Sequence, residues 1–182
     1  MTDTSDRYRT LAAAMTERIA AVPDDGWDAP TPCEDWTVRD LVGHLVDTTG
    51  MFFGFIGEEA LAGPSVDDDP AGAFAAARDA MQAALDDPAI AGKEYDGAFG
   101  RTTFSRSVDG FICADLVVHG WDLARATGQD EHLDPDEVHR VHEALKPMDE
   151  KMRGPGAFGP KIGPPPGADE QTELLCFLGR QV

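Results

Sequence analysis

Apolar residues recur at spacings of three and four along most of the chain, which is the pattern of amphipathic α-helices. The pattern predicts helices over residues 6–21, 37 to about 61, 71–85, 108 or 110 to 127, 134 to 148 or 152, and 169–178. Between them, aromatic and threonine residues around Gly97 and Gly100 favour an extended segment over 93–109, with a short hairpin near 95–108. The fold is therefore expected to be all-α apart from this hairpin.

Helix ends are marked by capping residues. Thr37 is a good N-cap, and Asp40 lies where its carboxylate can reach back to complete a capping box. Asp134 followed by Pro135 marks a second helix start. Residues 153–168 are too rich in glycine and proline to form a regular element.

The helix predicted to begin at Thr37 contains four glycines: Gly43, Gly50, Gly54 and Gly57. Each costs about 1 kcal/mol relative to alanine inside a helix, so their presence needs a reason. They indicate close approach of a neighbouring element or room left for a ligand. The alternative is that residues 50–57 form a poor helix.

Length and composition limit the class of protein. The 182 residues are expected to form a single domain, residues 1–182. The net charge of −19 and the pI of about 4.3 argue against binding to nucleic acid or to anionic membrane surfaces. No apolar run approaches the roughly 20 residues of a membrane span.

The cysteines and the first residues bear on location. The three cysteines have neither the CxxC spacing of a zinc site nor the pattern of a disulfide framework. The chain begins with a polar, acidic stretch that does not resemble a signal peptide. Both features predict a reduced, cytoplasmic setting.

His44 lies on the edge of the apolar face of its predicted helix, three residues after Leu41. Its imidazole would therefore point into, or along the rim of, whatever the helix packs against. By itself, such a histidine usually indicates only a core or rim position that is satisfied by a hydrogen bond.

A second stretch, residues 112–128, changes this interpretation. Asp115 and His119 are four residues apart in an otherwise strongly apolar helix, so their side chains point the same way. An isolated buried charge is expensive, and a divalent metal shared with His44 would compensate it. Two imidazoles and one carboxylate leave coordination positions open for water or substrate.

Zinc is the preferred ion for these ligands, and nickel, iron and manganese accept the same ligand types. A metal at this position could lower the pKa of a bound water or thiol, or polarise a carbonyl. Asp47 and Asp122 each follow a candidate histidine by one turn. Each is a candidate hydrogen-bond partner for an imidazole N–H, a replacement ligand, or a solvated carboxylate on the helix flank.

The other histidines and reactive side chains have simpler interpretations. Cys113 lies about 200° around the helix from Asp115 and is expected to fill the core. The remaining histidines are expected at the surface: His132, His139 and His142. Two tryptophans are expected to be packing residues: Trp36 and Trp121. The sequence favours no single substrate-binding arginine, and four are possible: Arg101, Arg106, Arg125 and Arg180.

The two stretches together resemble a known family. The pattern Pro32-x-x-x-Trp36-Thr-Val-x-Asp-Leu-x-x-His44-Leu, followed by Asp115-x-x-x-His119-x-Trp-Asp-Leu-Ala-x-Ala-x-Gly128, is similar to that of the DinB-like metal-binding superfamily. The branch it resembles most is the actinobacterial one related to the N-terminal domain of mycothiol-dependent maleylpyruvate isomerase. The ending Leu174-Leu-x-Phe-Leu-Gly-Arg180 resembles the same branch.

The resemblance implies an up-down four-helix bundle with a long crossover and one divalent metal on its axis, held by His44, Asp115 and His119. The resemblance further implies that the metal activates a low-molecular-weight thiol such as mycothiol or bacillithiol, which acts on a small-molecule electrophile in S-transfer, isomerisation or detoxification. A homodimer is compatible with the family. The isomerase has glutamate in place of Asp115 and a further C-terminal domain at its active site, so maleylpyruvate isomerisation itself is not expected here.

Two classes of function remain open. One is a metal-dependent thiol S-transferase or isomerase-like enzyme. The other is a non-catalytic metal-binding or interaction protein in which the site is structural or vestigial. A third hypothesis is a histidine–aspartate pair without metal that acts as a general base.

Overall fold

The computed structural model describes residues 3–59, 62–153 and 158–182. Its larger helices are α1 (Thr4–Ala20), α2 (Val38–Phe55), α3 (Pro70–Asp86), α6 (Cys113–Thr127), α7 (Pro135–Leu145) and α8 (Glu170–Phe177). Its shorter elements are α4 (Pro88–Ala91), β1 (Glu94–Gly97), β2 (Gly100–Thr103), α5 (Phe104–Ser107), the π-helical η1 (Val108–Ile112) and the 3₁₀-helical η2 (Lys146–Met152).

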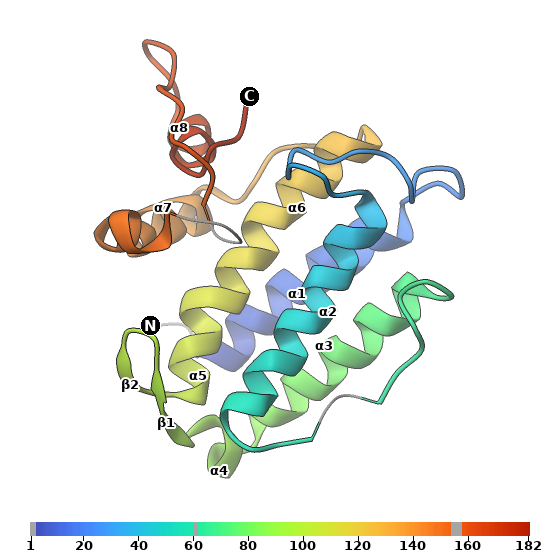
Figure 1. Ribbon diagram of the computed structural model, residues 1–182, viewed down its shortest axis with the longest axis vertical. Helices are drawn as coiled ribbons and strands as arrows, with labels where there is room; N and C mark the ends of the chain where they lie inside the picture. The colour runs from blue at the N-terminus through green and yellow to red at the C-terminus, as the bar shows by residue number, and fades with distance from the viewer. Residues whose placement is uncertain (1–2, 60–61, 154–157) are drawn as a thin grey trace.

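Four long helices form a bundle, as the sequence predicted (Figure 1). α1 packs against α3 and α6, and α2 packs against the same two helices. α2 and α3 run in the same direction, so the connection between them must return along the bundle (Figure 1). Val66, in this crossover, accordingly lies beside Gly43 in the first half of α2.

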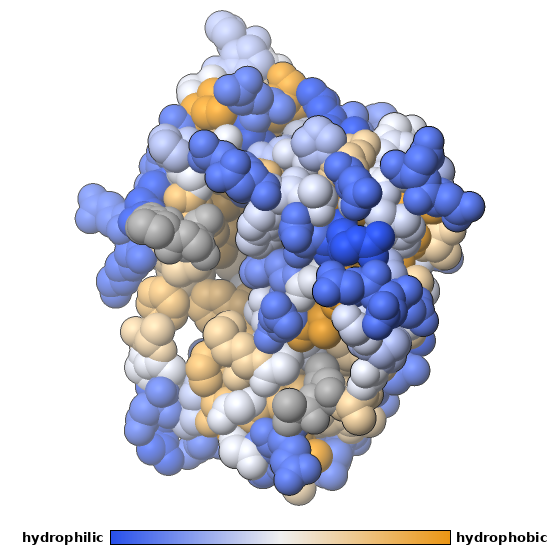
Figure 2. Space-filling view, turned by 45° about the vertical axis from the view of Figure 1, so that its right-hand side comes forward, coloured by the Kyte–Doolittle hydropathy of each residue, from blue (hydrophilic) through white to orange (hydrophobic). Residues whose placement is uncertain are grey.

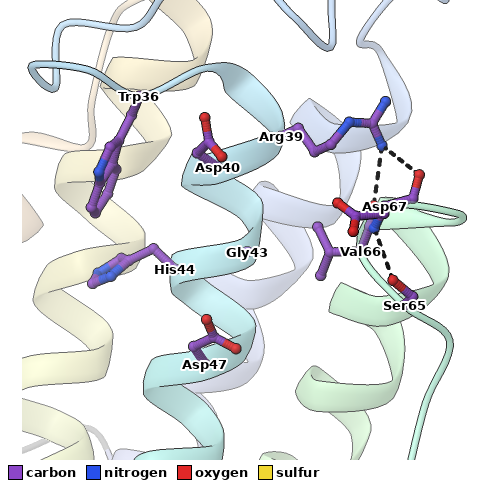
Figure 3. Close-up of a pocket in the computed structure, with 9 residues that line it drawn as sticks. All are labelled: Trp36, Arg39, Asp40, Gly43, His44, Asp47, Ser65, Val66 and Asp67. Atoms are coloured by element: carbon purple, nitrogen blue, oxygen red, sulfur yellow. Dashed lines mark hydrogen bonds between the residues drawn. The ribbon is translucent and has the colours of Figure 1, made fainter.

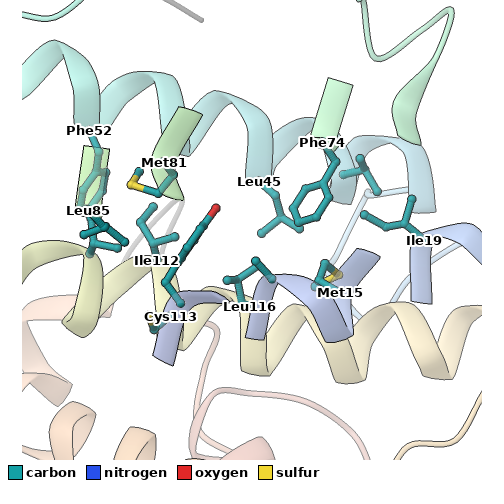
Figure 4. Packing of buried hydrophobic residues seen from close by; sticks show 14 of the residues in the cluster. Met15, Ile19, Leu45, Phe52, Phe74, Met81, Leu85, Ile112, Cys113 and Leu116 are labelled. Carbon is teal, nitrogen blue, oxygen red and sulfur yellow. The ribbon is translucent and has the colours of Figure 1, made fainter. Parts of the chain in front are cut away.

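The core of the bundle is made by apolar side chains that alternate at helical spacing on the four helices. Figure 4 shows side chains from all of them meeting between the ribbons, among them Met15, Leu45, Phe74 and Leu116. Each of these is at most 5% exposed. The predicted amphipathic faces are therefore the faces that the bundle buries.

α6 is covered on two sides, which explains its strongly apolar sequence. One side faces the bundle, and the other packs against α7 and α8 in a second apolar cluster that contains Val118, Val138 and Leu174. Every residue from Leu116 to Ala124 is buried. His119 and Asp122 are therefore buried polar residues that need partners.

The start of α2 is as predicted, but its end is not. Thr37 Oγ1 accepts a hydrogen bond from the Asp40 backbone N–H, and the Asp40 carboxylate accepts one from the Thr37 N–H, completing the capping box. The helix was expected to continue to about Leu61, which lies outside the described residues, but it ends at Phe55. Gly57 has a φ of 72°, a left-handed conformation that stops the helix.

The glycines within α2 do not interrupt it. The helix is continuous through Gly50 and Gly54, so the poor-helix interpretation is wrong up to Phe55. A Cβ at either glycine would meet nothing within 4 Å. No neighbouring element therefore approaches closely at these two positions, and neither glycine lines a cavity, so room left for a ligand there stays a prediction.

The predicted hairpin exists but is shorter than expected. β1 and β2 pair antiparallel over Glu94–Gly97 and Gly100–Thr103, joined by a two-residue turn. Residues 104–109 are helical rather than extended, because Thr103 caps α5 and both Phe104 and Val108 are fully buried. α5, η1 and α6 follow one another as a single helical run.

Two further expectations need correction. His142 was expected at the surface, but it is 5% exposed and contacts the ring of Phe177 on α8. The helix that contains it ends at Leu145, and residues 146–152 continue as a 3₁₀ helix around Pro147. Other expectations are confirmed: exposed His132 and His139, and buried Cys113 and Trp121.

Candidate metal centre

Three side chains with metal-binding atoms meet where α2 lies against α6. One ligand atom each from His44, Asp115 and His119 lies within 4.8 Å of the others. His44 Nε2 is 3.4 Å from Asp115 Oδ2, and the two imidazole ring centres are 5.0 Å apart. The three candidate ligands proposed from the sequence are therefore brought together across two helices.

Trp36 forms a wall of this group. Its ring centre lies 4.8 Å from that of His44 and 5.9 Å from that of His119. Figure 3 shows Trp36 and His44 projecting side by side toward α6. Trp36 packs against the core, as expected, and it also covers the two candidate imidazole ligands from one side.

His119 is hydrogen-bonded to the buried carboxylate of Asp122. Its Nδ1 lies 3.0 Å from Asp122 Oδ2. Asp122 also accepts hydrogen bonds from Arg180, from Nη2 to Oδ2 at 2.8 Å and from Nε to Oδ1 at 3.2 Å. Burial alone would raise the pKa of Asp122, but the hydrogen bonds from His119 and Arg180 outweigh it and lower the pKa to about 2.

An ionised Asp122 can only accept hydrogen bonds, so this contact needs the Nδ1–H of His119 as its donor. In the neutral imidazole, that tautomer leaves the lone pair of Nε2 available to a metal. A carboxylate that fixes the tautomer of a histidine is one of the usual partners of a metal-binding imidazole. Among the three roles that the sequence left open for Asp122, the geometry favours the hydrogen-bond partner.

Asp47 is placed differently. It is exposed on α2, and Figure 3 shows its carboxylate pointing away from the His44 ring. The neighbour of His44 Nδ1 is instead the hydroxyl of Thr48, at 3.4 Å. The structure thus brings Asp122, and not Asp47, to a candidate histidine.

Cys33 belongs to the same network, which the sequence did not reveal. Its Sγ lies 3.3 Å from Asp122 Oδ2, 3.3 Å from Arg180 Nη2 and 3.8 Å from His119 Nδ1. Burial and the charge of Asp122 raise the pKa of Cys33 to about 12, so it is a neutral thiol. A second possible metal-binding group consists of Cys33, His119 and Asp122, whose ligand atoms also lie within 4.8 Å of one another. The positive charge beside Asp122 is already supplied there by the Arg180 guanidinium.

The candidate ligands line a large cavity of about 1490 Å³ between α2, the hairpin and the α5–η1–α6 run. Four arginines line it, and three have acidic partners: Arg101 with Glu94, Arg153 with Asp149, and Arg180 with Asp122. The side chain of Arg106 has no hydrogen-bond or ion-pair partner in the part of the chain that the structure describes. Arg125 lies outside the cavity and pairs with Glu131.

A smaller hollow of about 510 Å³ lies on the other side of His44. Its far wall is the crossover segment, where Arg39 donates to the carbonyl oxygens of Val66 and Asp67, each at 3.1 Å (Figure 3). These bonds attach the crossover to the start of α2. His44 therefore stands between two hollows, of which only the larger also contains Asp115 and His119.

The fold and this group define a helical-bundle protein with a candidate divalent-metal centre in an open cavity. The chain belongs to the family described as the mycothiol maleylpyruvate isomerase N-terminal domain, whose model matches residues 8–124. This confirms the resemblance to the DinB-like superfamily. The match includes His44, Asp115, His119 and Asp122, and it ends before Arg180.

Two Mycobacterium tuberculosis proteins are similar over nearly the whole chain: "Uncharacterized protein Rv0738" of strain H37Rv and "Uncharacterized protein MT0763" of strain CDC 1551. Each is 30% identical over 171 residues, which is 93% of this chain and 93% of the relative. No solved structure gives a significant match. No helix in the described ranges combines the length and apolarity needed to cross a bilayer.

Proposed function

We propose that the protein is a metal-dependent enzyme that uses a low-molecular-weight thiol of the mycothiol type, as an S-transferase or an isomerase-like enzyme. The observation that carries the proposal is the position of His44, Asp115 and His119 on the wall of one large cavity. The family description, which names mycothiol, supports the choice of thiol.

The donor set fits a catalytic divalent ion. Two imidazoles and one carboxylate suit zinc first, with nickel, iron and manganese as alternatives, and three protein ligands leave a position for an exogenous ligand. When bound, such an ion would lower the pKa of a thiol or polarise a carbonyl. The partly exposed side chains of His44 and Asp115, at 30% and 34%, leave the group open to small molecules.

The chain's own residues have separate roles in this proposal. Asp122 and Arg180 orient His119 and fix its tautomer, which keeps Nε2 available. Trp36 limits access of water to the two imidazoles from one side. The cavity volume of about 1490 Å³ exceeds the roughly 300–1,000 Å³ of a pocket for one small ligand, so a thiol and an electrophile fit together.

The test is metal content combined with thiol-dependent turnover. Protein without a histidine tag is reconstituted with zinc, nickel or manganese, and metal is measured by elemental analysis. Consumption of mycothiol is then followed with chlorodinitrobenzene as a model electrophile. We expect about one ion per chain and turnover that depends on it, with both lost in His44→Ala and Asp115→Asn.

Asp47→Asn is the matched control for Asp115→Asn, because it removes the same negative charge from an exposed position one turn from His44. It should keep both metal and turnover. Metal that binds and stabilises the fold without thiol turnover would favour the non-catalytic alternative. No metal in the wild-type protein after reconstitution would refute the proposal.

A further inference from the structure

The large apolar side chains that remain exposed are concentrated at one place. Among the described residues, four such side chains are about half exposed: Met51 at 50%, Phe55 at 47%, Phe99 at 46% and Val182 at 52%. The first three all line the cavity that contains the candidate metal ligands, and Val182 does not. In Figure 2, apolar side chains surround a hollow at the left of the visible face.

Aromatic rings stack across this end of the cavity. Phe55 and Tyr95 stack at 5.4 Å with their planes 22° apart, and Phe99 and Phe111 stack at 5.8 Å with their planes 20° apart. Each pair joins the hairpin to a helix of the cavity wall, α2 or η1. The rings therefore form an aromatic wall in which Phe55 and Phe99 are about half exposed, with Lys151 Nζ 6.0 Å from the centre of the Phe99 ring.

This wall continues to the candidate ligands along both helices. On α2, His44, Thr48, Met51 and Phe55 follow one another at spacings of three and four, so they share one face. On the other side, Phe111 precedes Asp115 by four residues, a separation of about 6 Å along a helix. A molecule seated against Phe111 would thus reach the His44, Asp115 and His119 group.

The cavity also has room at this point. Gly110 lies in its lining, and a Cβ there would meet nothing within 4 Å. The absence of a side chain keeps the space beside Phe111 open. Exposed, stacked rings beside an open space suit a flat apolar guest, because stacking adds to the free energy of apolar burial.

We propose that this end of the cavity, formed by Met51, Phe55, Phe99, Gly110 and Phe111, binds the aromatic body of a small electrophilic substrate. The assignment of the guest as the electrophile rests on the proposed function. The wall leads directly to the three candidate ligands, which favours a small molecule that must reach them over a macromolecule that would cover the opening. The polar remainder of the cavity then stays available for the thiol.

The test uses N-phenyl-naphthylamine, a neutral aromatic probe whose fluorescence rises in an apolar site, and the full chain without added metal. We expect saturable binding of about one probe per chain. Phe99→Ser and Gly110→Leu should each weaken it about tenfold or more, the first by removing a ring and the second by filling the space. Val182→Ser is the matched control for loss of an exposed apolar side chain and should bind as the wild type does.

The outcomes separate this inference from the proposed function. His44→Ala should lose metal but keep probe binding, whereas Phe99→Ser should lose probe binding but keep metal. Absence of saturable binding, or equal binding by Phe99→Ser, would overturn the inference and leave the metal centre untouched. Sedimentation velocity gives the other overturning result: a wild-type dimer that Phe99→Ser converts to monomer would make this surface an interface between two copies of the chain.

Discussion

Arg180 donates to both carboxylate oxygens of Asp122, although the two residues are 58 positions apart in sequence. Asp122 is fully buried and Arg180 is 12% exposed in its side chain. Asp122 in turn accepts from the candidate ligand His119. The chain after α8 is thereby connected, through one buried ion pair, to the His119 imidazole of the candidate metal centre.

The first prediction concerns the stability contributed by this pair. Arg180→Gln would leave the Asp122 carboxylate buried without its cation, and we expect the free energy of unfolding to fall by about 3–5 kcal/mol. Urea denaturation measures it. Arg125→Gln is the control, because its pair with Glu131 is more than one-third exposed, and it should cost about 0.5 kcal/mol or less. A loss in Arg180→Gln no larger than in this control would contradict the prediction.

The second prediction concerns metal affinity. Asp122→Asn removes the charge that holds the Nδ1–H tautomer of His119, so metal affinity should fall by about 10- to 100-fold. Competition with a chelator, at a temperature where circular dichroism shows the variant folded, measures the change. Asp47→Asn makes the same change in net charge and should leave the affinity unaltered. Equal affinities for the two variants would show that Asp122 does not support the site.

The third prediction is a pH dependence from His142. Burial, together with the charge of Lys146, lowers the pKa of His142 below its ordinary value of 6.5, against the opposing charges of Glu143, Glu170 and Glu173. The unfolded chain therefore binds the proton more tightly than the folded chain does. The stability is fully present above pH 6.5 and is lost as the pH falls through the lower folded-state pKa.

His142→Gln should remove this dependence. The wild-type free energy of unfolding minus that of the variant is expected to be constant above pH 6.5 and to fall as the pH drops below 6.5. His132→Gln is the control, since hydrogen bonding to Asp130 raises the pKa of this exposed histidine instead. A wild-type minus His142→Gln difference that does not change with pH would contradict the prediction.

The fourth prediction concerns the start of α2, which positions His44. Thr37→Ala removes the side-chain half of the capping box and should lower the free energy of unfolding by about 1 kcal/mol. Thr10→Ala is the control: Thr10 lies within α1, is exposed, and bonds only to the carbonyl of Asp6. Urea denaturation of both variants measures the change, provided that the dependence of the free energy of unfolding on denaturant (the m value) is the same as in the wild type. Equal effects would mean that the cap contributes nothing specific.

The local sequence was enough to predict the positions of most helices and the three candidate metal ligands. Helical periodicity located the buried faces of α1, α2, α3 and α6, and the capping box located the start of α2. The spacing of Asp115 and His119 placed them on one face because an α-helix repeats every 3.6 residues. These properties depend on residues within one or two turns of each other, which a sequence pattern records.

Only the tertiary structure decided which distant residues complete the site. Cys33, Asp122 and Arg180 come from three separate segments, and no spacing in the sequence relates them. His142 looks like a surface residue among its charged neighbours, yet α8 packs over it and buries it. The aromatic wall likewise depends on the hairpin folding back onto α2 and η1. Contacts between distant segments follow from how helices pack, and a local pattern of polar and apolar residues does not specify that packing.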